Sequence, residues 1–353
     1  MTTIGIIGAG AIGQKHAVAA QQAGAAVRWV VDVDALRAED LAASCGASAA
    51  TTPEALLADA DVDAVVIGVP NRWHHRLALA ALEAGKDVLL EKPMATSAEQ
   101  CAEINAAAER AGRMLQVGYV HRYTSVGRTA LELVNDGTLG EIYHAKAQLW
   151  LRRGVPGLGK WFTTKRESGG GALMDVGVHL IDLALHLLGF PEAEEVTGQV
   201  YSNFGRRMRD YVFESMWAGP PDWDGVCDVE DAAHALVRFR SGATLSLDVA
   251  WAGNFPATAM PTSLVGLFGD RGGMAFQLFG DHVDLTVEED GAVVDRRVDA
   301  AERDAFHEQF LDFQRAVLER RCFGPTGQEG LVVQSIVDRV YGSSLPAPAP
   351  VEA

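Results

Sequence analysis

The sequence predicts an α/β protein with two domains, the first built on a parallel sheet and the second an α+β domain with an open, mostly antiparallel sheet. From Thr3 to about Gly118, short β-branched runs alternate with alanine- and leucine-rich segments, which is the pattern of βαβ units. From about Ala145, longer segments alternate between polar and apolar residues, which is typical of antiparallel hairpins. We expect the domains at residues 1–120 and 121–345, followed by a flexible tail at 346–353 that is rich in proline and alanine.

The individual elements follow from these patterns. Five short runs predict the strands of the first domain: IGIIG (4–8), VRWVVDV (27–33), AVVIGV (64–69), DVLLE (87–91) and MLQVG (114–118). Between them, helical segments are predicted over 75–85 and 98–112. In the second domain, the segments 233–251 and 282–298 predict two antiparallel hairpins.

Composition limits the class of function. The chain has 353 residues, of which 48% are hydrophobic and 22% charged, enough for two compact domains. Its net charge of -17 argues against nucleic acid or an anionic membrane as a partner. The start MTTIGIIGAG has no basic leader, and no later stretch approaches the ~20 apolar residues that span a bilayer, so we expect a cytoplasmic protein. The cysteines, which form no CxxC, are expected to be reduced thiols: Cys45, Cys101, Cys227 and Cys322.

A glycine motif follows the first predicted strand. It reads Gly8-Ala9-Gly10-Ala11-Ile12-Gly13, a GxGxxG that leads into a helical pattern. Its glycines permit a tight turn, close approach of a pyrophosphate to the backbone and close helix–strand packing, and the helix N-terminus adds partial positive charge. The sequence therefore predicts a Rossmann-type dinucleotide-binding domain.

Asp32 supports this prediction, because it ends the next strand at 32 − 13 = 19 residues beyond the last glycine. At this spacing an acidic side chain accepts hydrogen bonds from the adenosine ribose. A carboxylate there disfavours a 2′-phosphate, and Arg37 is the only nearby basic residue. We therefore expect NAD to be preferred over NADP.

The stretch LLEKPMATS (89–97) places a charged pair where a buried strand stops. This strand comes late in the βα series, so Lys92 is expected at the carboxyl edge of the sheet, where parallel sheets bind ligands. Adjacent residues on an extended chain point to opposite faces, so Lys92 is not expected merely to pair with Glu91.

Four stretches together resemble the glucose-fructose oxidoreductase and inositol dehydrogenase family (Gfo/Idh/MocA): GIIGAGAIGQKH, VIGVPNRWHHRLALAALEAGKDVLLEKPMA, QVGYVHRY and SGGGALMDVGVHLIDL. The resemblance implies NAD(P)-dependent oxidation or reduction of sugars, cyclitols and related compounds. It also implies a second domain whose open sheet mediates oligomerisation, as a homodimer or homotetramer. The catalytic residues that it implies are Lys92, Asp175 and His179, and Pro70, Asn71 and His74 would lie near the nicotinamide. We count as cofactor-binding candidates Gly8, Gly10, Ala11, Ile12, Gly13, Asp32, Pro70, Asn71, His74, Glu91 and Lys92.

A helical segment supplies the second polar cluster. Asp175, His179, Asp182 and His186 lie at offsets of zero, four, seven and eleven, which at ~100° per residue places them within about 60° on one helix face. We expect Asp182 and His186 to pack the helix, and Asp175 and His179 to carry chemistry, because buried polar groups need partners. A metal site is not expected, since the four span 186 − 175 = 11 residues, about 16 Å. Of the other histidines, His16 is expected to pack its helix, and His121 has no partner that the sequence reveals.

The mechanism that fits these residues is reversible hydride transfer between a secondary alcohol and nicotinamide. His179 would be the general base, Lys92 would stabilise the developing negative charge on oxygen, and Asp175 would orient the substrate or the histidine. Two alternatives stay open: an NAD-sensing regulator without turnover, and an enzyme that cleaves glycosides through transient oxidation.

A basic loop precedes this helix at residues 151–171. It holds Arg152, Arg153, Lys160, Lys165 and Arg166 against Glu167, a balance of 5 − 1 = +4. These cations are either solvated or paired elsewhere, or they recognise a carboxylate or phosphate on a sugar-like substrate. The candidate substrate-binding residues are Arg122, Tyr123, Trp161, Lys165 and His179, with Trp161 and Phe162 offering flat surfaces to a sugar ring.

Overall fold

The computed structural model describes residues 2–212, 214, 218–256 and 262–345. Within it the chain folds into two compact units, one of Met1–Thr124 with Glu302–Gln334 and one of Ser125–Ala301 with Ser335–Ala353. This division differs from two continuous domains in one respect, because Glu302–Gln334 packs with the N-terminal segment. The predicted tail at 346–353 lies outside the described residues.

The first unit contains a parallel six-stranded sheet in the order β3-β2-β1-β4-β5-β6. The strands are β1 (Thr3–Ile7), β2 (Ala26–Val31), β3 (Ser48–Ala50), β4 (Ala64–Ile67), β5 (Asp87–Glu91) and β6 (Leu115–Gly118). Five of them are the strands that β-branched runs predicted, which confirms the Rossmann-type fold. The sixth, β3, was not predicted because Ser-Ala-Ala carries no β-forming residue.

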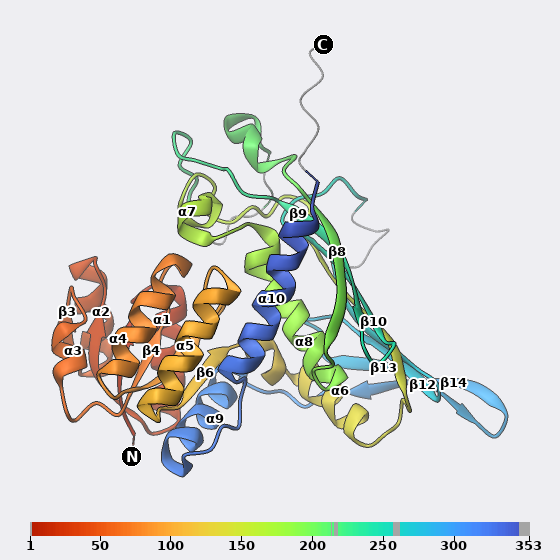
Figure 1. Ribbon diagram of the computed structural model, residues 1–353, viewed down its shortest axis with the longest axis horizontal. Coiled ribbons are helices and arrows are strands. Elements are labelled where there is room, and N and C mark those ends of the chain that lie inside the picture. The colour runs from red at the N-terminus through yellow and green to blue at the C-terminus, as the bar shows by residue number, and fades with distance from the viewer. Residues whose placement is uncertain (1, 213, 215–217, 257–261, 346–353) are drawn as a thin grey trace. The chain divides into compact units, whose positions relative to one another are not determined.

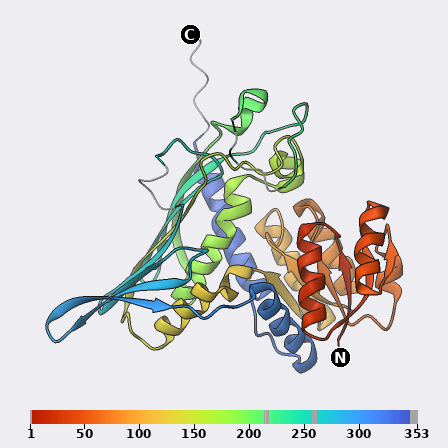
Figure 2. The same cartoon turned by 180° about the vertical axis from the view of Figure 1, so that it is seen from behind.

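Helices cover both faces of this sheet. They are α1 (Ala11–Gln22), α2 (Ala35–Cys45), α3 (Glu54–Ala58), α4 (His74–Glu83), α5 (Ala98–Ala111) and α9 (Ala305–Glu319), with short 3-10 turns η1 (Asn71–Trp73) and η2 (Val120–Tyr123). Figure 1 shows α4 and α5 in front of the sheet, and Figure 2, taken from behind, shows α1 in front. Since β1 lies between β2 and β4, the strand order reverses beside the glycine motif, where doubly wound sheets bind their ligands.

The second unit contains an eight-stranded sheet in the order β14-β13-β12-β11-β7-β10-β9-β8. The strands are β7 (Ile142–Trp150), β8 (Ala193–Tyr201), β9 (Ala232–Phe239), β10 (Thr244–Ala250), β11 (Ser263–Gly269), β12 (Gly272–Phe276), β13 (His282–Glu289) and β14 (Ala292–Asp299). Neighbouring strands pair antiparallel except β7 and β10, which are parallel. The predicted mostly antiparallel sheet is therefore confirmed, including both hairpins.

The helices of this unit lie on one side of its sheet. They include α6 (Ser125–Asn135), α7 (Lys165–Ser168) and α8 (Val178–Leu188), the turns η3 (Trp161–Thr163) and η5 (Gly205–Asp210), and a π-helical turn η4 (Leu173–Gly177) that runs directly into α8; α10 (Gly327–Ser343) enters this unit at Ser335. Figures 1 and 2 show α6 and α8 on one face of the sheet, whose opposite face carries no described helix of this unit.

One stretch that reaches the length and hydropathy of a membrane span was not expected from the sequence. Within the described residues, Lys165–Leu188 is long enough to cross a membrane, and its most apolar 18-residue window has a mean hydropathy of 1.5. However, 78% of its most apolar window is buried inside the structure. The apolar residues of α8 thus pack against β7 and β10, and the segment is a core helix rather than a membrane span.

Candidate active site

The glycine motif of the first unit forms the turn between β1 and α1. Gly8 has a φ of +105°, and a Cβ there would lie 2.1 Å from the Gly68 carbonyl oxygen. A Cβ on Gly13 would lie 1.8 Å from the Gly8 carbonyl oxygen, so only glycine fits at either position. At Gly10, by contrast, a Cβ would meet no atom within 4 Å. Helix α1 begins at the next residue, Ala11, followed by Ile12, and no side chain caps it. The loop therefore offers exposed backbone to a ligand, which is how dinucleotide-binding turns hold a pyrophosphate.

Asp32 lies just past β2, where the sequence places the ribose-binding acid. Its Oδ2 accepts a hydrogen bond of 2.8 Å from the Ala9 amide and its Oδ1 one of 2.9 Å from the Asp34 amide. The carboxylate is therefore fixed against the glycine loop, and it retains lone pairs for further donors. Arg37, the one nearby cation that the sequence suggested for a 2′-phosphate, is paired with Asp34 at 3.2 Å.

The proline-asparagine turn after β4 carries three of the predicted cofactor-binding residues. Pro70 precedes η1, where Asn71 is buried. The imidazole of His74 is 1% exposed and lies between two carbonyl oxygens, Pro93 O at 2.7 Å from Nδ1 and Val69 O at 2.8 Å from Nε2. Burial lowers the pKa of His74, against the opposite effect of these carbonyls, so a neutral ring donates to one of the two at a time. His74 thereby joins the segment after β4 to the segment after Lys92.

Glu91 ends β5, and its carboxylate contacts α1 in addition to the Lys92 amide, which donates to Oε2 at 3.2 Å. Its Oε1 lies 2.7 Å from Nε2 of His16, a fully buried residue of α1 whose ring packs edge-on against Phe306. The Glu91 carboxylate also lies so close to Gly118 that a Cβ there would be 2.8 Å from it. His16 packs its helix, as expected, and through Glu91 it also fixes the end of the strand from which Lys92 emerges.

Lys92 follows β5 and precedes a cis peptide bond to Pro93. Burial of the His121 ring, and to a smaller extent the nearby positive charge of Lys92, lower the pKa of His121 to about 4. Strand β6 is aligned with β5 so that Gly118 pairs with Glu91, which brings the following turn η2 beside Lys92. The sequence did not reveal this neighbour, because the register that brings His121 there is a tertiary feature.

Two predicted substrate-binding residues lie in this turn but are buried. The Arg122 guanidinium donates to Glu329 at 3.2 Å, and its side chain is 6% exposed. Tyr123 is 2% exposed, with its hydroxyl facing Gly324 so closely that a Cβ there would be 2.5 Å away. Both side chains hold the start of α10 and the segment before it within the first unit.

In the second unit, Asp175 and His179 lie one turn apart across the junction of η4 and α8. The sequence predicted one continuous α-helix, whereas the structure begins it with a π-helical turn, a rare form that is enriched at functional sites. Asp175 is buried, and its Oδ2 accepts a hydrogen bond of 3.1 Å from the indole Nε1 of Trp251. Trp251 fixes one oxygen of the carboxylate, a contact between residues 76 positions apart that the sequence could not reveal.

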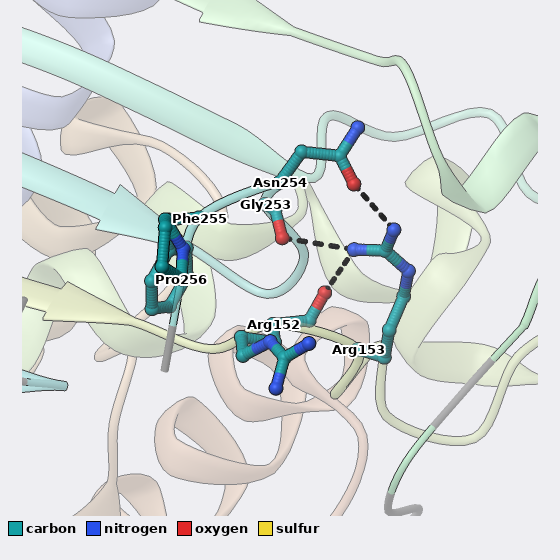
Figure 3. Close-up of a pocket in the computed structure, with 6 residues that line it drawn as sticks. All are labelled: Arg152, Arg153, Gly253, Asn254, Phe255 and Pro256. Atoms are coloured by element: carbon teal, nitrogen blue, oxygen red, sulfur yellow. Dashed lines mark hydrogen bonds between the residues drawn. The ribbon is translucent and has the colours of Figure 1, made fainter. Parts of the chain in front are cut away.

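Two of the cations of the basic loop are held by the protein. The Arg153 guanidinium donates to Gly253 O at 2.8 Å, to Arg152 O and to Asn254 Oδ1 (Figure 3). Arg152 pairs with Glu214 at 3.3 Å, although its side chain is still 41% exposed. A shallow pocket of about 220 Å³ is lined by Arg152, Arg153, Gly253, Asn254, Phe255 and Pro256.

The other loop candidates have mixed surroundings. The rings of Trp161 and Phe162 stack on each other with centroids 3.7 Å apart, so part of each flat surface is already covered. The Lys165 amide donates to Asp228 at 2.6 Å and its side chain is exposed. Across the residues that the structure describes, no cluster of three metal-ligating side chains is found.

Two family descriptions match the chain. Residues 2–119 match an oxidoreductase family with an NAD-binding Rossmann fold, and residues 128–275 match a GFO/IDH/MocA C-terminal domain.

Individual proteins are similar over most of the chain. D-glucoside 3-dehydrogenase of Escherichia coli strain K12 is 31% identical over 318 residues, which are 89% of this chain and 87% of the relative. Glucose-6-phosphate 3-dehydrogenase of Bacillus subtilis strain 168 is 32% identical over 218 residues, 59% of each chain.

Solved structures are also similar over nearly the whole chain. An oxidoreductase domain protein from Kribbella flavida is 27% identical with a TM-score of 0.83 over 97% of both chains. GenD2 from gentamicin A biosynthesis, solved in complex with NAD, is also 27% identical, with a TM-score of 0.76 over 97% of this chain and 93% of that one. The chain thus belongs to the GFO/IDH/MocA oxidoreductase family, with an NAD-binding Rossmann N-terminal domain and the family's C-terminal domain.

Proposed function

We propose that this protein is an NAD-dependent dehydrogenase that oxidises or reduces a secondary alcohol of a sugar, cyclitol or related polyol. The observation that carries the proposal is Lys92, which leaves the carboxyl edge of the parallel sheet in the same unit as an open glycine loop. Family membership and the Asp175–His179 pair on a helix that begins with a π-turn support it further.

The residues of the first unit fit a dinucleotide. The open position at Gly10 and the uncapped start of α1 would hold the pyrophosphate, and Asp32 would accept hydrogen bonds from the ribose. When bound, NAD supplies the nicotinamide that exchanges a hydride with the substrate carbon.

The proton chemistry belongs to this chain. His179 would accept the proton of the substrate hydroxyl through a ring nitrogen, a role that suits the ordinary pKa of histidine. The Lys92 ammonium would donate a hydrogen bond to the same oxygen and stabilise its growing negative charge. Asp175, already fixed at one oxygen by Trp251, would orient the substrate or the imidazole.

The substrate proposal starts from the names of the relatives, two of which act at position 3 of a glucoside or of glucose 6-phosphate. We therefore expect C3 of a hexopyranoside to be oxidised first. The test is to screen sugars, glycosides and cyclitols for NADH formation. Oxidation of none of them would contradict the proposal.

Whether the substrate carries an anion depends on the basic loop. Because Arg152 and Arg153 are already engaged, Lys160, Lys165 and Arg166 are the remaining cations for a carboxylate or phosphate. Comparing kcat/KM for a neutral sugar with its uronate and its phosphate at two salt concentrations tests this. No preference for the anion at low salt would leave a neutral glycoside as the substrate.

We also propose that NAD is preferred over NADP. A 2′-phosphate would lie against the Asp32 carboxylate, and Arg37, which could otherwise receive it, is paired with Asp34. We expect kcat/KM for NAD to exceed that for NADP by ~10-fold or more. Equal values would show that Asp32 does not select the cofactor.

Two further functions remain open to test. A regulator that senses NAD would bind NADH without turnover, and an enzyme that cleaves glycosides through transient oxidation would release sugar without net NADH. The same screen, with product analysis added, distinguishes both from a dehydrogenase. We expect the protein to be cytoplasmic and to assemble as a homodimer or homotetramer.

A further inference from the structure

Glu230, which is outside the proposed catalytic set, accepts hydrogen bonds from the backbone at the start of the helix that carries Asp175 and His179. Glu230 accepts hydrogen bonds at its Oε1 from the Gly171 amide at 2.9 Å and from the Leu173 amide at 3.0 Å. Its own main-chain carbonyl accepts one of 3.1 Å from the Ala172 amide between them. Glu230 thus satisfies three successive amides of the first turn, which otherwise have no partner within a helix.

Tyr341 holds the same carboxylate from α10. Its hydroxyl donates to Glu230 Oε1 at 2.9 Å, and Glu230 is 5% exposed. Burial raises the pKa of Glu230, while the donors from Gly171, Tyr341 and Leu173 act in the opposite direction. We call these two residues the Glu230–Tyr341 clamp.

The glycine run before the helix is shaped by the clamp. A Cβ on Gly170 would lie 2.0 Å from the Tyr341 hydroxyl oxygen, and one on Gly171 would lie 1.8 Å from the Glu230 carbonyl oxygen. Neither position has room for a side chain. The glycines therefore allow the clamp to reach the backbone of the first turn.

The residue after Glu230 holds Trp251, the hydrogen-bond partner of Asp175. Asp231, which follows Glu230, accepts a hydrogen bond of 2.8 Å from the Trp251 amide at its carbonyl oxygen. The Trp251 indole in turn donates to Asp175. Two adjacent residues, Glu230 and Asp231, thus set both the start of the helix and the partner of its aspartate.

We propose that Glu230, held by Tyr341, is a positioning residue for the reaction: the clamp fixes the first turn of the catalytic helix and so the direction in which Asp175 and His179 point. The inference rests on the proposed dehydrogenase function. It assigns no contact with substrate to Glu230, which acts through the backbone of residues 171–173. A small displacement of catalytic groups costs turnover far more than it costs binding.

The test compares Tyr341→Phe, Glu230→Gln and Glu230→Ala with the wild type on the sugar found by the screen. Tyr341→Phe removes a single oxygen, and we expect kcat to fall ~10-fold while KM and the dissociation constant of NADH stay within about twofold. Glu230→Gln keeps an acceptor oxygen and should lose less than Glu230→Ala. The matched controls are Tyr143→Phe and Glu288→Gln, at exposed positions of the same unit, which should retain wild-type kcat.

The outcome that overturns the inference is a lowered melting temperature with kcat unchanged, because the clamp would then be only structural. A second readout serves even if a variant folds poorly or no sugar is oxidised. Amide hydrogen exchange of residues 169–179 should be faster in Tyr341→Phe than in Tyr143→Phe, and equal exchange contradicts the clamp. A wild type that oxidises no sugar contradicts the proposed function alone, and the exchange comparison then decides the inference.

Discussion

Two helices in this protein begin after a cluster of glycines, and the two starts are built in opposite ways. At α1, the position of Gly10 opens onto empty space and no side chain caps the helix. At η4 and α8, the space before the helix is filled by Tyr341 and Glu230, which leave no room for a Cβ on Gly170 or Gly171.

The difference shows that a glycine cluster before a helix has two distinct physical causes. In the first unit, Gly8 and Gly13 also lack room for a Cβ, but Gly10 opens onto empty space and leaves the backbone at the start of α1 available to a ligand. In the second they admit buried side chains of the protein itself, so that the helix start is satisfied without a ligand. Substitutions at Gly10 and at Gly171 should therefore affect different properties.

The largest effect is expected from Gly171→Ala. Its methyl group would lie 1.8 Å from the Glu230 carbonyl oxygen, so the backbone must shift and the free energy of unfolding should fall by roughly 3 kcal/mol. Urea denaturation without NAD measures it. Gly342→Ala, where a Cβ meets no atom within 4 Å, is the matched control and should be close to neutral. Equal stability of the two variants would remove the distinction between the clusters.

Lys92→Ala and His179→Ala test the proposed chemistry in the first and in the second unit. Each should lower kcat by ~10²-fold or more, the usual scale of a charge-stabilising or acid–base group, while NADH affinity stays near that of the wild type. His282→Ala, a partly exposed histidine of β13, is the control for loss of an imidazole. Near wild-type turnover in either catalytic variant would show that its role is assigned wrongly.

Gly10→Ala tests whether the start of α1 is open for a ligand. Because nothing lies near the added methyl group, the free energy of unfolding should stay within about 1 kcal/mol of wild type. The methyl group would instead intrude on a pyrophosphate, so NADH should bind ~10-fold more weakly, as measured by its fluorescence. Unchanged NADH affinity would mean that this opening is not the cofactor cradle.

The smallest effect concerns charge in the first unit. Burial and Lys92 lower the pKa of His121 to about 4, so an NMR titration should find its ring neutral down to about pH 5, and Lys92→Ala should raise that pKa. The unfolded chain takes up this proton near pH 6.5 and the folded protein only near 4, so stability present above pH 6.5 is lost as the pH falls between them. An unchanged pKa in Lys92→Ala would place the lysine charge elsewhere.

The fold could be predicted where local sequence carries the signal. The β-branched runs fixed five parallel strands, and alternation identified the hairpins β9–β10 and β13–β14. Strand β3 was missed because Ser48–Ala50 has no strand-forming residue. The return of Glu302–Gln334 to the first unit was missed because an amphipathic helix pattern does not specify the surface that it packs on.

Residues of the candidate site could be predicted where a short stretch of backbone restricts which residue type fits. The glycine spacing, Asp32 and the end of β5 are such features, and each is a short stretch of sequence. The partners of the site residues are distant instead: His16 meets Glu91 across 75 positions and Trp251 meets Asp175 across 76. Their side chains are ordinary in sequence, and only tertiary packing gives them a role. The same holds for the π-turn, since periodicity predicts helix but not its local widening.

The parallel pairing of β7 with β10 sets the order in which the second unit can fold. His144 and Thr244, partners across this pairing, are 100 positions apart, and the helix formed by η4 and α8 lies in the segment between them. Closing a loop of this length costs about 4 kcal/mol of chain entropy before any pairing is gained. Hairpins with local contacts, such as β13–β14, can form earlier, and slow non-local pairing is expected to limit the rate. The packing of α8 against β7 and β10 should therefore be among the last features of this unit to form during refolding.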